Sequence, residues 1–252
     1  MIEEKRQSGV FLTVLGFGTG NYKDNKMEQL ANKGNGNFYY IDTANEAKKV
    51  LVSELGSTLF AIAKDVKVQI EFNPAKIKAY RLIGYENRIL AKEDFNDDTK
   101  DAGELGAGHS VTAIYELVPA GSGEEFISVD PLKYQQQEKV TSSELLTVKL
   151  RYKEPDGDTS KLISNNVSSD EIAQSPSGDF QFAAAVAEFG LLLRQSEFKQ
   201  NASYEHVISA AQSSRGEDTY GYRTEFIELV KKAQNLDTRP QPMTGSGGIN
   251  FK

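Results

Sequence analysis

The chain has 252 residues, of which 38% are hydrophobic, and this length allows one or two globular domains. Its net charge of −7 comes from interspersed acidic and basic residues, which argues against a nucleic-acid surface with a basic stripe. The absence of cysteine excludes disulfides, thiolate nucleophiles and zinc–thiolate sites. No apolar run approaches the roughly 18 residues of a membrane span, and the charged start MIEEKRQSG lacks the apolar core of a signal peptide.

The first predicted element is the apolar run Val10–Leu15, which lies between glycines and is typical of a parallel strand covered on both faces. A glycine-rich loop, residues 16–25, separates it from apolar residues at positions 27, 30 and 31, which have helical spacing. The aromatic segment Asn37–Ile41 then predicts a second strand. Strand, helix and strand in this order predict a βαβ unit with parallel strands.

Residues 9–42 also resemble the fifth strand, fifth helix and sixth strand of a von Willebrand factor type A domain. The likeness is carried by Gly-Phe-Gly at the strand end, by Met-Glu-x-Leu-Ala in the helix, and by Gly-Asn-Gly before the aromatic strand. The metal-ion-dependent adhesion site of that family begins with Asp-x-Ser-x-Ser, a motif that this sequence lacks. The resemblance therefore implies a truncated type A remnant without its metal-binding half. It also implies a parent protein in the cell envelope or periplasm.

Further along the chain the period of the apolar residues changes. Thr43–Leu55 is predicted to be a helix, with Thr43 and Glu46 at the spacing of a capping box. Alternating apolar and polar residues then predict half-buried strands of an antiparallel layer. These strands are expected at 66–72, 77–83, 111–117, 146–152 and 161–167, with a long polar loop over 120–143.

From Ser175 onward the pattern is helical. Ser175 is predicted to cap a helix whose stretch Phe180–Leu193 is apolar nearly all round, which indicates burial on every side. Two more helices carry apolar faces within 204–211 and 222–233. Segments 84–119 and 218–233 resemble the C-terminal module of bacterial type A proteins, a domain of unassigned function.

The fold class expected from these patterns is α/β plus α+β. A truncated parallel-sheet type A remnant precedes an antiparallel β layer and a C-terminal three-helix bundle. The predicted domains are residues 1–58, 59–238 and a flexible tail at 239–252.

One acidic cluster is the strongest candidate for metal chemistry. It lies in the loop Glu93–Glu104, and its spacing from Asp94 matches the D-x-N-x-D start of an EF-hand. The match then fails, because the sixth position is Thr99 rather than glycine and the twelfth is Leu105 rather than glutamate. A solvated loop is therefore the preferred interpretation. The acidic residues of the cluster are Glu93, Asp94, Asp97, Asp98, Asp101 and Glu104.

Four further features have both a chemical and a structural interpretation. His109 beside Ser110 invites a hydrolase hypothesis, but the sequence has no G-x-S-x-G elbow. The run Gly16–Gly20 departs from both phosphate-binding fingerprints, so we expect tight turns there. We also expect His206 and the aromatic group Tyr220, Tyr222, Arg223 and Phe226 to serve helix packing.

The sequence thus favours a non-enzymatic protein-binding or scaffolding module, with no catalytic residue, cofactor or metal. A protein is expected as partner of the parent type A domain, as the resemblance implies. The edge strand Val10–Leu15 is also expected to be covered by self-association, by the C-terminal tail or by the second domain, because the strand that would flank it in the family's sheet order is missing from this sequence. The alternative is a divalent-cation-binding enzyme or hydrolase that uses the Glu93–Glu104 loop and His109.

Overall fold

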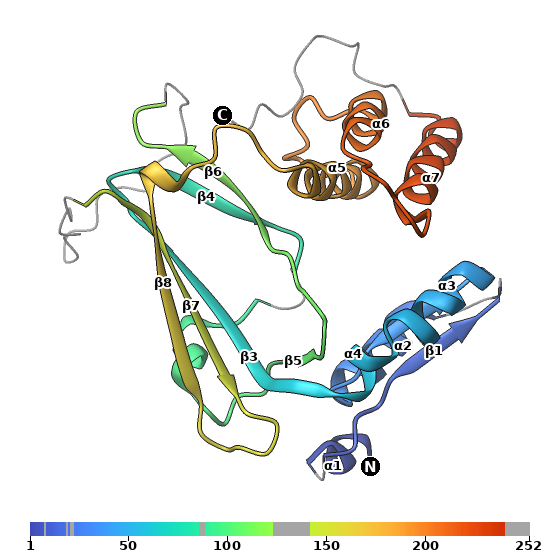
Figure 1. Cartoon of the computed structure of the whole chain (residues 1–252), viewed down its shortest axis with the longest axis vertical. Helices are drawn as coiled ribbons and strands as arrows, with labels where there is room; N and C mark the ends of the chain where they lie inside the picture. Colours follow the sequence, from blue (N-terminus) through green and yellow to red (C-terminus); the bar gives the residue numbers. More distant parts are fainter. Residues whose placement is uncertain (8, 19, 21–22, 86–88, 123–141, 240–252) are drawn as a thin grey trace. The chain divides into compact units, whose positions relative to one another are not determined.

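The computed structural model describes residues 1–7, 9–18, 20, 23–85, 89–122 and 142–239 (Figure 1). These residues form two compact units. The first comprises Met1–Lys78, Asn87–Thr112 and Pro119–Asp170, and the second comprises the rest. The predicted long loop falls mostly on residues 123–141, and the tail on 240–252, so both lie outside the described residues. The chain is a mixed α/β protein. Within the described residues, no helix is long and apolar enough to cross a membrane.

A βαβ unit follows the short helix α1 (Ile2–Gln7). It consists of β1 (Val14–Phe17), α2 (Asp24–Lys33) and β2 (Phe38–Ile41), and the two strands pair in parallel, as the pattern predicts. The predicted bounds and burial of the first strand are wrong. β1 begins at Val14 rather than Val10, and side chains before it are exposed, with Val10 at 58% and Phe11 at 40%. The run is therefore not buried on both faces, since its first three side chains are exposed.

Glycines allow the segment before β1 to approach the turn after α2. A Cβ atom on Gly36 would lie 2.0 Å from the carbonyl oxygen of Leu12, closer than any side chain tolerates. Leu12 in turn donates its N–H to the carbonyl of Gly34, at 2.9 Å. The Gly-Asn-Gly sequence thus fits a place where two backbones meet, which is a common reason for glycine.

The predicted helix over Thr43–Leu55 is broken into three parts. The hydroxyl of Thr43 accepts a hydrogen bond from the N–H of Glu46 at 3.2 Å, so the predicted cap is confirmed. Helix α3 (Ala44–Lys48) runs into a π-helical turn (Lys49–Ser53), and after Glu54 the helix α4 (Leu55–Leu59) begins. The interruption lies where a β-branched pair, Val50 and Val52, weakens helical preference.

A four-stranded antiparallel sheet forms the body of the first unit. Its order is β5-β3-β7-β8, where β3 is Ala61–Phe72 and β7 is Glu144–Lys153. The edge strands are β5 (Gly103–Gly106) and β8 (Lys161–Ser168). β7 and β8 are close to the predicted ranges, whereas β3 begins at Ala61, five residues before its predicted start at Val66. β5 was not predicted because its sequence, GELG, carries no alternating pattern.

A separate pair of strands is formed by β4 (Ile77–Ile83) and β6 (Ile114–Pro119). The prediction for β4 is confirmed to the residue, whereas β6 begins three residues after the predicted start at Val111. Short 3₁₀ turns occupy Lys92–Asn96 and Ser169–Glu171.

The predicted alternation along β3 is wrong at its centre. Lys67 is only 4% exposed, whereas Val68, expected on the covered face, is 56% exposed. The pairing of β3 with β7 shifts register between Lys64 and Lys67, and Asp65 has a φ of 51°. Such a bulge re-aims the side chains beside it. The face that carries Lys67 is covered by the loop that follows residue 91, as the contacts below show.

The second unit contains α5 (Gly178–Leu193), α6 (Tyr204–Ser213) and α7 (Tyr222–Leu236). The three helices share one hydrophobic core, in which Tyr204, Val207 and Val230 are almost fully buried. Two predictions for α5 are wrong. Its cap is Ser177 rather than Ser175, because the Ser177 hydroxyl accepts the N–H of Phe180 at 3.2 Å. The helix is also buried on one side only, since Val186 is 42% exposed and Leu193 52%.

Candidate functional site

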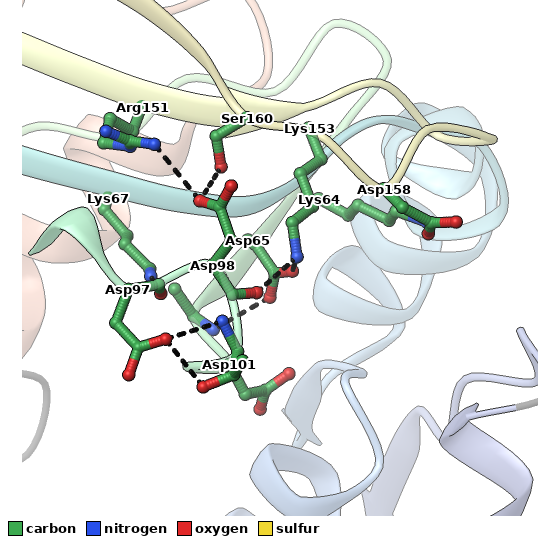
Figure 2. A network of polar contacts seen from close by, with 12 residues as sticks. Lys64, Asp65, Lys67, Asp97, Asp98, Asp101, Arg151, Lys153, Asp158 and Ser160 are labelled. Carbon is green, nitrogen blue, oxygen red and sulfur yellow. Dashed lines mark hydrogen bonds and ion pairs between the residues drawn. The ribbon is translucent and has the colours of Figure 1, made fainter. Parts of the chain in front are cut away.

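The main polar site lies where a loop, residues 92–101, crosses the face of β3 and β7 (Figure 2). Lys67 points from β3 into this loop. Its ammonium donates to the backbone carbonyls of Asp94 at 3.1 Å and of Asp97 at 2.5 Å. Phe95, between these two residues, is buried with 5% exposure. A buried ammonium and a buried phenyl ring therefore hold the loop against the sheet.

A second lysine holds the same loop from β7. Lys153 donates to the carbonyl of Asp98 at 2.8 Å and to the carboxylate of Asp65 at 2.7 Å. Its side chain is 11% exposed and that of Asp65 is 16% exposed. The hydrogen bond and the negative charge of Asp65 raise the pKa of Lys153. The ammonium is therefore held in its charged form, as a buried cation requires.

The third cationic contact comes from Arg151, also on β7. Its guanidinium donates to the side-chain oxygen of Asn96 at 3.1 Å and to the carboxylate of Asp98 at 3.2 Å. Ser160 donates to the same Asp98 oxygen at 2.5 Å. The hydroxyl of Ser160, and secondly Arg151, lower the pKa of Asp98 below its usual value.

These contacts show what the EF-hand-like spacing does. Asp94, Asn96 and Asp98 offer oxygens, as an EF-hand loop offers them to calcium. Here the carbonyl of Asp94 is bound by Lys67, and the side chains of Asn96 and Asp98 are bound by Arg151. Two of the three side chains that the EF-hand hypothesis would use, Asn96 and Asp98, are therefore bound by Arg151, and the third, Asp94, faces Lys100. We call the loop 92–101 with Lys67, Arg151 and Lys153 the cation-clamped loop.

The other acidic residues of the predicted cluster have local partners or lie in solvent. Asp97 accepts from the N–H and hydroxyl of Thr99, at 2.9 and 2.6 Å, and both bonds lower its pKa. The carboxylate of Asp94 faces Lys100 at 3.5 Å. Glu93 is exposed. These arrangements stabilise the turn rather than open a coordination site.

The last two acidic residues of the cluster, Asp101 and Glu104, instead meet Asp65. One oxygen from each of the three lies within 4.8 Å of the others. Two chain cations neutralise two of the three carboxylates, since Lys153 binds Asp65 and Arg6 binds Asp101 at 2.8 Å. Burial, and next the charges of Asp65 and Asp101, raise the pKa of Glu104 to about 7. We assign no metal site here, because proximity of carboxylates alone does not make one.

His109 is exposed and lies apart from this chemistry in the contacts described. Its backbone N–H donates to the carbonyl of Gly106 at 3.1 Å, and Ser110 is exposed too. Gly106 itself sits against α4, where a Cβ would lie 1.7 Å from the carbonyl oxygen of Ser57. Gly106 thus serves a close backbone approach, whereas Gly108 has open space around it and a φ of 75°.

The glycine run after β1 also has a structural role in the part that is described. Gly18 has a φ of 86° and accepts the hydroxyl of Tyr40 at 2.6 Å through its carbonyl. A Cβ on Gly16 would lie 3.3 Å from the terminal carbon of Met27. These contacts fit the expected tight turn, and Thr19 lies outside the described residues.

In the second unit, His206, Arg223 and Phe226 contribute to packing, whereas the prediction for Tyr220 is wrong, because its side chain is 62% exposed. Nδ1 of His206 lies 2.7 Å from a carboxylate oxygen of Glu188, whose side chain is 4% exposed. Phe226 makes edge contacts with Phe182 and Phe189, at centroid distances of 5.3 and 5.6 Å. Arg223 lies over the ring of Phe182. An open groove of about 340 Å³ runs along α6 and α7 and is lined by Gln212, Arg215, Thr224, Ile227, Glu228 and Lys231.

Sequence reasoning missed the cationic half of the site. Lys67 and Lys153 lie on strands with polar alternation, where a lysine is expected to face water. Asp65, Asn35 and Arg6 carry no motif either. The available signal is indirect, since a loop rich in carboxylates and carbonyls near a sheet needs cations to neutralise it.

The chain is similar to known proteins over most of its length. The family model described as "Uncharacterized protein YfbK, C-terminal" matches residues 57–236. The uncharacterized protein YfbK of Escherichia coli (strain K12) is 44% identical over 240 residues. That alignment covers 94% of this chain and 41% of the relative. The chain therefore spans about two fifths of the length of the curated relative that it matches.

Two solved structures show weaker likeness. The crystal structure of the ArnB paralog VWA2 from Sulfolobus acidocaldarius has a TM-score of 0.40 at 15% identity, over 88% of this chain and 51% of that one. The von Willebrand factor type A protein from Catenulispora acidiphila has a TM-score of 0.38 at 14% identity, over 91% and 53%.

Proposed function

The chain belongs to the family of the YfbK C-terminal domain, and from this premise we propose that it is a non-enzymatic protein-binding or scaffolding module. We also propose that residues 1–58 correspond to the last part of a von Willebrand factor type A domain. The sequence motifs within residues 9–42 and the parallel βαβ unit support this proposal. A bacterial cell-envelope protein is the setting that this proposal implies. The protein partner of the longer polypeptide would bind through the type A part.

The non-enzymatic half of the proposal is supported by how the polar groups are used. Catalytic groups need to face a substrate with free donors or acceptors. In the cation-clamped loop, Asp98 is instead bound by Arg151 and Ser160, and the carbonyls of Asp94 and Asp97 are bound by Lys67. These bonds fix a loop to a sheet, so these polar groups are used within the fold.

The free edge of β1 is the observation that supports the proposal of protein binding. Within the described chain, β1 pairs with β2 only, so its other edge offers unpaired backbone groups. The apolar approach to this strand is exposed, with Val10 at 58% and Phe11 at 40%, and Phe17 at its end is 53% exposed. An edge strand flanked by exposed apolar side chains is a template for another strand. We propose that, in the isolated chain, a second copy pairs with the free edge of β1 and covers the exposed apolar side chains of the segment Val10–Leu15.

Sedimentation velocity over a concentration series tests this proposal. We expect a monomer–dimer equilibrium. Its dissociation constant should rise at least tenfold in Val10→Lys, because dimerisation would remove the new lysine charge in the segment Val10–Leu15 from water. The matched control is Leu229→Lys, a substitution of a leucine that is 54% exposed on α7, and it should leave the equilibrium unchanged. A wild-type chain that stays monomeric at every concentration, or equal weakening by both variants, contradicts the proposal.

A further inference from the structure

Glu104 has one carboxylate oxygen with a partner and one without. Oε1 accepts a hydrogen bond from the side-chain amide of Asn35 at 2.7 Å. Oε2 is buried and has no hydrogen-bond partner among the described residues. A carboxylate oxygen in this state costs free energy when charged, whereas a protonated oxygen needs only an acceptor.

Two other carboxylates lie near Glu104. Glu104, on β5, shares its cluster with Asp65 of β3 and with Asp101 of the preceding loop, all within 4.8 Å. The cations that face this cluster are Lys153 of β7, bound to Asp65, and Arg6 of α1, bound to Asp101. Lys64 of β3 acts on Glu104 only as a weaker, more distant charge. Three carboxylates against two directly bound ammonium or guanidinium groups leave one negative charge uncompensated when Glu104 is ionised.

The same cluster is where the N-terminal elements meet the sheet. The amide of Asn35, in the turn after α2, donates both to Glu104 and to Asp101, the latter at 3.2 Å. Arg6 donates to Asn35 at 3.3 Å and to Asp101 at 2.8 Å. Asn35 therefore draws two carboxylates together, which is stable only if their mutual repulsion is small.

We propose that Glu104 is a proton-operated latch, which holds α1 and the α2–β2 turn on the four-stranded sheet when it is protonated and loosens them when it is ionised. Protonation of Glu104 removes the uncompensated charge from its cluster with Asp65 and Asp101. Burial and the two aspartates raise the pKa of Glu104 from 4.5 to about 7, which puts the change near neutral pH. Because the folded-state pKa is raised, the stabilisation is complete below about pH 4.5 and is lost as the pH rises through about 7.

Hydrogen exchange of backbone amides tests the latch on the full chain. After correction for the intrinsic pH dependence of exchange, we expect protection in residues 30–38 to fall at least tenfold between pH 5.5 and 8. Glu104→Gln keeps the shape and cannot ionise, so its protection should not depend on pH over this range. The control Glu154→Gln alters a glutamate that is 48% exposed and paired with Lys161, and it should keep the wild-type decline.

A direct titration keeps the inference testable if Glu104→Gln does not fold. Carbon-13 NMR of the Glu104 carboxyl group in the wild-type chain should show a midpoint near pH 7. A midpoint at the usual value, or an equal loss of protection in wild type and Glu104→Gln, would overturn the latch. The latch does not depend on the proposed dimer, because sedimentation can show a monomer while the exchange result still holds.

Discussion

Replacing Lys67 by methionine removes the ammonium of the cation-clamped loop and keeps most of the side-chain volume. Two hydrogen bonds from a charged donor are lost, those to the carbonyls of Asp94 and Asp97. Each such bond is worth about 1.5–3 kcal/mol, so the gross loss is about 3–6 kcal/mol. The variant also no longer buries a charge at a site that is 4% exposed. The desolvation penalty that is avoided offsets several kcal/mol of the lost stability. The expected net loss of stability is therefore about 1–3 kcal/mol, felt mainly in the loop.

The assay is local, because a chain of two units need not unfold in one step. Hydrogen exchange of residues 92–101 should accelerate about 5- to 160-fold in Lys67→Met, which is the predicted free-energy range expressed as a rate. The control is Lys149→Met, on β7 of the same sheet. Lys149 pairs with Glu71 at 3.1 Å and is 33% exposed, so its loss should cost less than about 1 kcal/mol. Unchanged exchange of the loop in Lys67→Met, or equal effects of both variants, would refute the clamp.

Two other substitutions test the packing. Gly106→Ala should lower the thermal midpoint by several degrees, because its Cβ would lie 1.7 Å from the carbonyl oxygen of Ser57, whereas Gly103→Ala, with open space at that position, should shift it by about a degree or less. Equal shifts would show that the approach of α4 to β5 is not as close as described. Glu188→Ala should destabilise the helical unit by about 1–3 kcal/mol in urea denaturation, because it leaves the N–H of Ser203 and the ring of His206 without their buried partner. A loss below about 0.5 kcal/mol would mean that this pair adds nothing to the fold.

The sequence predicts elements well where local pattern and tertiary structure agree. The parallel βαβ order, the cap at Thr43 and the bounds of β4 follow from periodicity and turn chemistry alone. Predictions were wrong where the local pattern allows more than one choice, or where contacts with another part of the chain determine the structure. A second serine, Ser177, two residues later, caps α5 in place of Ser175. Local spacing does not distinguish two serines that both precede the same apolar stretch.

The site shows this limit most clearly. Alternation along β3 predicts that Lys67 faces water and that Val68 faces the core, yet Lys67 is buried. A bulge near Asp65 and a loop from residues 92–98 produce this result, and neither can be read from the strand itself. The acidic loop was found by composition, whereas its three cations come from strands 25 or more residues away in sequence. Charge balance predicts that such partners exist, but only the fold shows which they are.

Isothermal titration calorimetry with calcium and with magnesium tests the central claim most directly, namely that chain cations and not a metal ion hold the acidic loop. We expect no stoichiometric heat with a dissociation constant in the micromolar range, because Arg151 binds the side chains of Asn96 and Asp98, and Lys67 and Lys153 bind backbone carbonyls of the same loop. One-to-one micromolar binding that is lost in Asp98→Asn would contradict it and would support the alternative of a divalent-cation site at Glu93–Glu104.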